Sequence, residues 1–307
     1  MVNPLNFSRA IIAALRDGFN QSRRNILASL QCVAVDYMAG VMKDAATFTP
    51  FELVPGQGDI ILVCDHARNA VPPDLGDLGV PPDDMGRHIA FDIGARAVTL
   101  RMADALGAPA VLSTFSRLVI DPNRGEFDPT LIMRLYDGTI IEGNRRVDAV
   151  ERARRISAYH RPYREQLGRA IDTCLADGGA PILVSIHSYT PQLRGHEPRP
   201  WHVGLLWAQD DRLFRPLMAG LHRHPDLVVG DNQPYSGSLP GDTMWTYGIR
   251  RGLPHVLIEV RNDLIAEPEG QDEWAELLVT ELRAAVDQLR ASGQAAPRPV
   301  ENPDQEV

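Results

Sequence analysis

The stretch PILVSIHSYTP, residues 181–191, is an apolar run that ends abruptly in a histidine and a serine. Runs of this kind, bounded by turn-forming residues, are expected for strands buried on both faces of a sheet. Two other stretches end in a similar way. DIILVC, residues 59–64, is followed closely by His66, and PHVLIEV, residues 254–260, carries Glu259 near its end. We therefore expect three buried strands that finish in polar side chains.

The rest of the chain alternates between strand and helix patterns. Further strands are expected in APAVLST, WHVGLLWA and DLVVGD, and helices at residues 85–106, 147–177 with an interruption near Pro162, 210–222, 242–251 and 271–291. Such alternation predicts an α/β fold: a single three-layer domain with a mainly parallel, twisted sheet and helices on both faces. We place an N-terminal helical extension at residues 1–49, the working domain at 50–291, and a tail that is disordered by composition at 292–307.

The composition argues against some classes of binding partner and indicates a cellular location. The formal net charge is −9 with both signs mixed along the chain, which argues against nucleic acid as a partner. No apolar run approaches the roughly 20 residues that span a bilayer, so no membrane partner is expected. The three cysteines are odd in number and far apart, which is typical of a reducing compartment, and the cytoplasm is the expected location.

The three polar strand ends predict one site. Ligands of an open parallel sheet bind beyond the carboxyl ends of its strands, where groups distant in sequence converge. Two histidines, His66 and His187, with a carboxylate match the three protein ligands of catalytic zinc. A single histidine at a strand end is more often structural, but two at equivalent positions favour a metal site. Glu259 is either one partner of a buried salt bridge, for example with Arg261, or a base beside an activated water.

The sequence offers more than one candidate for the third metal ligand and for the residues that contact substrate. His88 and Asp92 are four residues apart on the predicted helix 85–106, and we expect Asp92 to be the ligand and His88 to support it or contact substrate. In the loop FSRLVIDPNRG, Arg117, Asn123 and Arg124 suit an anionic substrate, although a turn with solvated charges is the alternative.

A second loop, DNQPYSGSLPGD at residues 231–242, is either a mobile lid or a simple connection. Ser188, which follows His187, is expected to contact substrate. A rival mechanism would use Cys64 as the nucleophile, because it lies two residues before His66. A cysteine within an apolar strand more often behaves as a small hydrophobic residue.

Five ordered motifs, DHARNAVP, RHIAFDIGA, SRLVIDPNR, SIHSYTP and IEVRND, resemble those of the N-formylglutamate amidohydrolase family. The resemblance spans residues 50 to about 290. The family is similar to the zinc carboxypeptidase and aspartoacylase group, which implies a phosphorylase/hydrolase-like fold and metal-dependent hydrolysis. Zinc carboxypeptidases place a glutamate three residues after the first histidine, whereas Asn69 stands there in this chain. The carboxylate ligand must therefore come from elsewhere.

By resemblance, the activity is hydrolysis of N-formyl-L-glutamate to L-glutamate and formate, late in histidine degradation, with Zn2+ or another divalent metal as cofactor. The resemblance implies metal ligation by His66, His187 and Asp92, with Glu259 as the general base. It assigns Asn123 and Arg124 to the substrate carboxylate. From chemistry, Arg124, aided by Arg117, stabilises either that carboxylate or the tetrahedral oxyanion.

Two other functions remain open at this point. One is an amidase that acts on another N-acyl amino acid or on a peptidoglycan fragment. The other is a non-catalytic protein that keeps a metal and an anion pocket. The oligomeric state is not predicted by the sequence, and the partner expected in either enzymatic case is a small anionic N-acyl amino acid.

Overall fold

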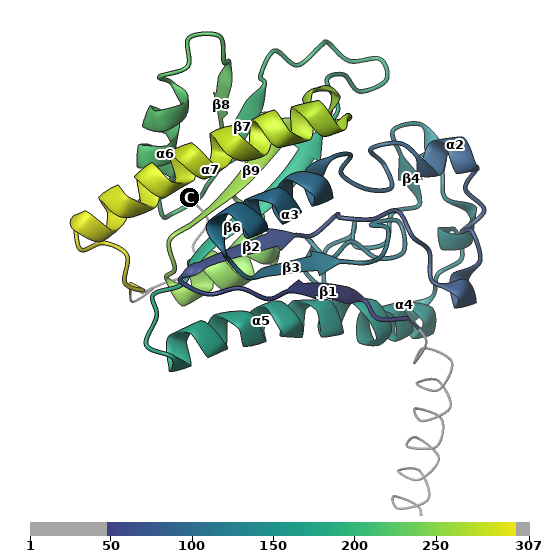
Figure 1. The fold of residues 1–307 in the computed structure, drawn as a ribbon. Coiled ribbons are helices and arrows are strands. Elements are labelled where there is room, and N and C mark those ends of the chain that lie inside the picture. Colours follow the sequence, from purple (N-terminus) through teal and green to yellow (C-terminus); the bar gives the residue numbers. More distant parts are fainter. Residues whose placement is uncertain (1–47, 299–307) are drawn as a thin grey trace, which may run out of the picture. The chain divides into compact units, whose positions relative to one another are not determined.

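One mixed sheet forms the centre of the computed structural model, which describes residues 48–298. Its order is β1-β3-β2-β6-β9-β7-β8 (Figure 1). The strands are β1 (Phe51–Val54), β2 (Ile60–Cys64), β3 (Ala110–Ser113), β6 (Ile182–Tyr189), β7 (Val203–Leu206), β8 (Val229–Asp231) and β9 (His255–Arg261), with a separate hairpin of β4 (Leu135–Tyr136) and β5 (Thr139–Ile140).

The four central strands, β3, β2, β6 and β9, are parallel to one another. The sheet becomes mixed toward its edges, because β1 is antiparallel to β3 and β7 is antiparallel to β9, while β8 runs parallel to β7. The prediction of a mainly parallel sheet is confirmed. Strand β1 is not among the predicted strands, because it is a short edge strand that is only partly buried.

Strand β6 shows why the central strands are apolar throughout. All eight of its residues are buried. Successive side chains of a strand point to opposite faces. Val184 and Ile186 therefore enter one apolar core, while Ser185 and His187 point to the other face. The face that carries Ser185 and His187 is the one on which the site lies.

Helices cover both faces of the sheet, so the predicted three-layer α/β architecture is confirmed (Figure 1). Helices α3 and α6 each pack against α7, and the three share one apolar core with the sheet. Helix α5 lies across the other face, against β1, β2 and β3. The helices are α2 (Pro82–Met85), α3 (Ala95–Leu106), α4 (Ala149–Arg155), α5 (Arg161–Ala176), α6 (Phe214–Leu221) and α7 (Pro268–Ala291).

The prediction of one helix over residues 85–106 is wrong in its first half. Helix α3 begins at Ala95, and residues 86–94 form turns. Gly94 has φ 79°, and a Cβ on it would lie 2.1 Å from the carbonyl oxygen of Ile265. The chain therefore requires glycine at this position, and its left-handed conformation ends the turns before the helix starts.

The other helical predictions hold in outline. The interruption expected near Pro162 is a π-helical turn, Ile156–His160, directly before α5. The stretch predicted as helix at residues 242–251 is a π-helical turn, Met244–Gly248, followed by a 3-10 turn.

The predicted helical extension at residues 1–49 lies almost wholly outside the described residues. The predicted disordered tail is described only as far as residue 298. There, the buried Arg212 donates hydrogen bonds to the carbonyls of Gln294 and Ala296, and Arg298 donates its N–H to the Gly252 carbonyl. Residues 292–298 are thus held against the domain. Among the helices of residues 48–298, none has the length and apolarity needed to cross a membrane.

Candidate metal centre and active site

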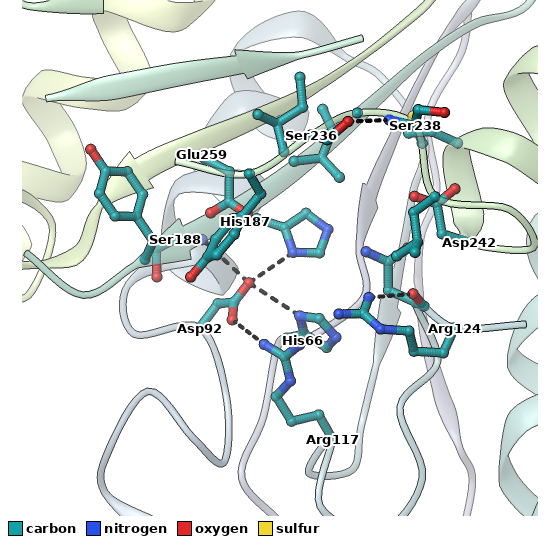
Figure 2. Close-up of a pocket in the computed structure, with 18 of the residues that line it drawn as sticks. His66, Asp92, Arg117, Arg124, His187, Ser188, Ser236, Ser238, Asp242 and Glu259 are labelled. Carbon is teal, nitrogen blue, oxygen red and sulfur yellow. Dashed lines mark hydrogen bonds and ion pairs between the residues drawn. The ribbon is translucent and has the colours of Figure 1, made fainter. Parts of the chain in front are cut away.

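The three polar strand ends meet at one rim of the sheet (Figure 2). His66 follows β2 on a turn, His187 lies within β6, and Glu259 lies within β9. His187 and Glu259 are direct partners in the β6–β9 register, so their side chains stand next to each other on the same face. The topology thus brings together groups that are up to about 190 residues apart in sequence.

Two imidazoles converge on one carboxylate oxygen. Oδ2 of Asp92 lies 2.8 Å from Nδ1 of His187 and 3.3 Å from Nδ1 of His66. One ligand atom from each of these residues lies within 4.8 Å of the other two, and all three residues are buried. The two rings meet edge to face with their centroids 4.9 Å apart. This is a compact set of two nitrogen donors and one oxygen donor.

Two further carboxylates fix the orientation of the imidazoles. Nε2 of His66 lies 2.7 Å from Asp121, and Nε2 of His187 lies 3.3 Å from Asp65. A carboxylate accepts hydrogen bonds, so each Nε2 donates its proton to one, and the neutral form of each ring would then have its lone pair on Nδ1. Carboxylate–histidine pairs of this kind are the usual support of metal-binding histidines. The donor set therefore fits a divalent metal such as zinc.

The electrostatics of the cluster also favour a cation. Burial disfavours a charged imidazole, yet hydrogen bonds to Asp65 and Asp92 raise the pKa of His187 to about 10. Burial alone would raise the pKa of Asp92, but the charges of His66 and its bonds to both histidines lower it. The site thus attracts positive charge.

Asp92 reaches the site from a loop and not from a helix. Its N–H donates to the His66 carbonyl at 2.9 Å, which ties the loop to the end of β2. Its Oδ2 also accepts the N–H of Ser188. His88, the alternative ligand, lines the same pocket but lies beside Asp137 and Tyr136 instead of in the donor set.

Glu259 is buried beside the donor set and has no ion-pair partner among residues 48–298. Within the described residues its Oε2 has no hydrogen-bond partner, and burial raises its pKa to about 7. The salt bridge considered with Arg261 is absent, because Arg261 pairs with Asp263. A carboxylate with a pKa near 7 is suited to take up and release a proton at neutral pH.

The two arginines of the loop after β3 differ in their partners. Arg117 bonds both Asp92 and Asp121, so it braces two carboxylates of the metal centre. Arg124 lines the pocket and donates only to the uncharged acceptors Thr130 and the Asn123 carbonyl among the residues described. Arg124 is therefore the guanidinium that remains available to an anion.

The other two predicted substrate contacts are already engaged within the protein. The amide oxygen of Asn123 accepts the N–H of Thr243 at 3.0 Å, and the Ser188 hydroxyl donates to the Ile93 carbonyl at 2.7 Å. Both residues line the pocket. Asn123 keeps its amide nitrogen free to donate among the described contacts, whereas the Ser188 hydroxyl has already used its proton.

A pocket of about 300 Å³ opens from the metal centre. The loop at residues 231–242 forms part of its wall, since Tyr235, Ser236, Ser238 and Leu239 line it. The loop is anchored: Asn232 accepts the N–H groups of both Trp207 and Gly237. Further lining residues include Tyr136, Tyr189, Leu206, Trp207, Asp242, Met244, His255 and Leu257.

Sequence reasoning missed the supporting carboxylates, although Asp65 stands directly before His66 and Asp121 stands in a loop that had been singled out. Asp65 is fully buried and accepts bonds from Tyr163, Thr243 and Ser185 as well as from His187. The sequence did contain a signal for Asp65, because this aspartate follows an apolar strand and directly precedes a histidine. His255, which the sequence does not single out, is also buried and lines the pocket.

Cys64 does not belong to the site. It is fully buried in the apolar core shared with α3, and it is not among the residues that line the pocket. Burial raises the pKa of its thiol, which disfavours the thiolate that a nucleophile requires. The cysteine mechanism therefore has no support in the geometry.

Comparisons with known proteins agree with this architecture. A gene product from Agrobacterium tumefaciens has a solved structure with 32% identity and a TM-score of 0.76, and the match covers 80% of this chain and 98% of that chain. The N-formylglutamate amidohydrolase from Ralstonia eutropha shares the fold at 22% identity, with a TM-score of 0.57 and coverage of 80% and 100%. The comparison with curated proteins gave no significant match.

The family model described as N-formylglutamate amidohydrolase matches residues 58–266, which include the donor set, Arg124 and Glu259. This match covers well over half of the 307 residues. The chain therefore belongs to the N-formylglutamate amidohydrolase family.

Proposed function

We propose that this protein is a zinc-dependent amidohydrolase that cleaves the amide bond of an N-acyl amino acid, with N-formyl-L-glutamate as the first substrate to test. The products would be L-glutamate and formate, as in the last steps of histidine degradation, and we place the enzyme in the cytoplasm. The observation that carries the proposal is the buried donor set of His66, Asp92 and His187 with an unpaired Glu259 beside it.

His66 and His187 would hold the ion through Nδ1, and Asp92 through Oδ2. Three protein ligands that leave a further position open are typical of catalytic zinc. When bound, the ion supplies Lewis-acid activation of water and of the amide carbonyl. Asp65 and Asp121 keep the two imidazoles in the tautomer that this requires.

Glu259 acts as the general base and then as the general acid. Its carboxylate takes the proton of the attacking water and delivers it to the nitrogen of the leaving amine, which departs as the C–N bond breaks. The raised pKa of Glu259, about 7, suits both transfers. Its position opposite His187 in the register places it next to the ligands and not among them.

Arg124 binds the substrate carboxylate. Its guanidinium faces the pocket and has no carboxylate partner among residues 48–298. An unpaired cation at the wall of a small pocket is suited to bidentate binding of a carboxylate. Asn123, whose amide group lies beside it, orients the same group. Arg117 is already engaged with Asp92 and Asp121, so its role is to hold these carboxylates in place.

The proposal is tested by metal analysis together with formate release from N-formyl-L-glutamate. We expect bound zinc, loss of turnover on chelation, and recovery when zinc is returned. Asp92→Asn should lose the metal, whereas His88→Ala should retain it, which separates the two candidate ligands. Full turnover after metal removal would refute the metal mechanism. Bound metal without hydrolysis of any N-acyl amino acid or peptidoglycan fragment would favour the non-catalytic alternative.

A further inference from the structure

The pocket has two chemically different sides, and the order of the strands separates them. Arg124 follows β3, the metal ligands follow or lie in β2 and β6, Glu259 lies in β9, and Leu206 ends β7. In the sheet, β3 and β7 lie on opposite sides of β2, β6 and β9. Arg124 belongs to the loop after β3, whose Asp121 bonds His66, so it lies on the His66 side of the pocket. Figure 2 shows Glu259 and Arg124 on opposite sides of His187.

The side beyond Glu259 is mostly apolar, with His255 at its inner end. We define the apolar arm as Leu206, Trp207, Met244 and Leu257, all of which line the pocket. Leu206 and Leu257 are direct partners in the β7–β9 register. Leu257 precedes Glu259 by two residues, so its side chain lies on the same face, about 6.6 Å further along the strand. The apolar arm therefore extends from the catalytic base toward the interior.

The apolar arm is a fixed part of the structure. The Trp207 ring stacks on Phe214 with centroids 4.7 Å apart, and its indole N–H donates to Asp231 at 2.8 Å. Its backbone N–H donates to Asn232, and a Cβ on Gly237 would lie 2.3 Å from that nitrogen. The loop is thus packed closely on Trp207, and the arm has a defined shape before any ligand binds.

An amide held at the metal centre has two substituents that leave it in opposite directions. If the carboxylate of the amino acid lies on Arg124, the acyl substituent points toward Glu259 and the apolar arm. A formyl group carries only a hydrogen there and would leave the arm without contacts. The arm is consequently larger than the smallest family substrate needs.

We propose that the apolar arm is an acyl-binding subsite, and that the enzyme accepts N-acyl-L-glutamates whose acyl chain has several carbons. This inference rests on the proposed hydrolysis at the same site. Each methylene that enters the arm strengthens binding by up to about fourfold, which corresponds to the free energy of burying a methylene group. Selectivity for longer acyl chains then comes from Leu206, Met244 and Leu257.

The first test measures binding apart from turnover. N-formyl-, N-acetyl-, N-butanoyl- and N-hexanoyl-L-glutamate are titrated into zinc-loaded Glu259→Gln protein by calorimetry. We expect the affinity to rise along the series until the arm is filled. A constant or falling affinity beyond the acetyl compound would overturn the acyl assignment. N-formyl-L-norleucine belongs in the same series, because its tighter binding would assign the arm to the amino-acid side chain.

The second test changes the arm and follows kcat/KM for the hexanoyl compound divided by that for the formyl compound in zinc-loaded enzyme. Leu206→Phe should lower this ratio at least tenfold by filling the arm, and Leu257→Ala should raise it for longer chains. Leu175→Phe, a change on the exposed side of α5, is the matched control and should leave the ratio unchanged.

The outcomes separate the two proposals. If no N-acyl amino acid is hydrolysed, the proposed function fails, while the binding series still decides whether the arm takes acyl chains. If the formyl compound is hydrolysed and longer acyl compounds neither bind nor react, only the subsite is refuted. Opposite shifts of the ratio in the two arm variants would support the subsite even if one of them folds poorly at higher temperature.

Discussion

The two faces of strand β6 are equally buried but tolerate different side chains. Val184 and Ile186 are 0% exposed in a core of hydrocarbon, and His187 on the other face is only 2% exposed. The difference lies in the partners. Ser185 and His187 both bond Asp65, and His187 also bonds Asp92. A strand can thus carry polar groups deep in a protein when each one meets a complementary group.

The largest effect of a substitution on activity is expected at Glu259, a buried polar group that departs from this rule. Glu259 is the buried carboxylate with an oxygen that lacks a partner among residues 48–298. Replacing it in Glu259→Gln removes proton transfer and should lower kcat for N-formyl-L-glutamate by about a thousandfold. Metal content and the free energy of unfolding should change little, because no hydrogen bond of Oε2 is lost. Near-normal turnover in this variant would remove Glu259 from the mechanism.

The next largest effect is expected from substitution of the carboxylates that support the two imidazoles, Asp65 and Asp121. Asp65→Asn places an amide NH2 against the hydroxyl donors of Tyr163 and Thr243, so the orientation of His187 is weakened. We expect the affinity for zinc to fall about ten- to a hundredfold, measured by competition with a chelator.

Asp226→Asn, at an exposed position, is the matched control for the loss of charge and should bind zinc normally. Equal zinc affinity in the Asp65 and Asp226 variants would show that the Asp65 contact does not position His187.

The apolar face should respond in stability and not in metal binding. Ile186→Ala leaves a cavity in the packed core and should lower the free energy of unfolding by about 3 kcal/mol, measured by urea denaturation. Its neighbour His187 keeps both carboxylate contacts, so zinc affinity should be retained at temperatures where the variant is folded. Loss of zinc together with stability would show that the two faces are not independent.

His160 is a buried histidine outside the donor set, and it allows the cost of burying an imidazole without a carboxylate partner to be measured. His160 bonds the Arg124 carbonyl, and burial lowers its pKa to about 4. Because the unfolded imidazole titrates near 6.5, the unfolded state binds more protons between pH 6.5 and 4, and stability falls over this window as the pH drops. His160 should contribute a loss of about 3 kcal/mol by pH 4.

The measurement is the difference in free energy of unfolding between pH 7 and pH 4.5, compared between the wild type and His160→Gln. The variant should show a smaller acid-induced loss, even if it is less stable at both pH values. An identical pH dependence in the two proteins would mean that His160 is not held neutral in the folded state.

The smallest effect on activity is expected at Cys64. Its side chain lies on the core side of β2, so Cys64→Ala should leave turnover within about a factor of two while reducing stability slightly. Formate release by the variant checks this. Abolished turnover in a folded, zinc-loaded variant would revive the thiol mechanism.

The sequence predicts the parts of the fold that depend on continuous burial. The central strands β2, β6 and β9 are visible as apolar runs because both of their faces are covered. Edge strand β1 is four residues long and partly exposed, so no periodic pattern marks it. The helix before Ala95 was wrongly predicted because apolar spacing cannot reveal that Gly94 lies against the Ile265 carbonyl.

The site is only partly visible in the sequence. His66, His187 and Glu259 stand out because polar residues interrupt apolar strands, and the structure brings them to one rim. The bond of Asp121 to His66 and the engagement of Arg117 with two carboxylates arise only from tertiary packing. The sequence cannot show that Arg117 bonds two carboxylates whereas Arg124, within residues 48–298, bonds only uncharged acceptors. That difference is the basis for proposing Arg124 as the anion-binding residue.

The pairing of His187 with Glu259 in adjacent strands has a consequence for engineering. If β9 slipped by one position against β6, Ile258 would turn toward the metal centre and Glu259 would enter the hydrocarbon layer beneath α7. A misaligned chain would therefore lose its proposed catalytic base and its stability together. Loops that join these strands can be redesigned in length only if the alignment of β9 is kept, so a stability screen would also select for intact chemistry.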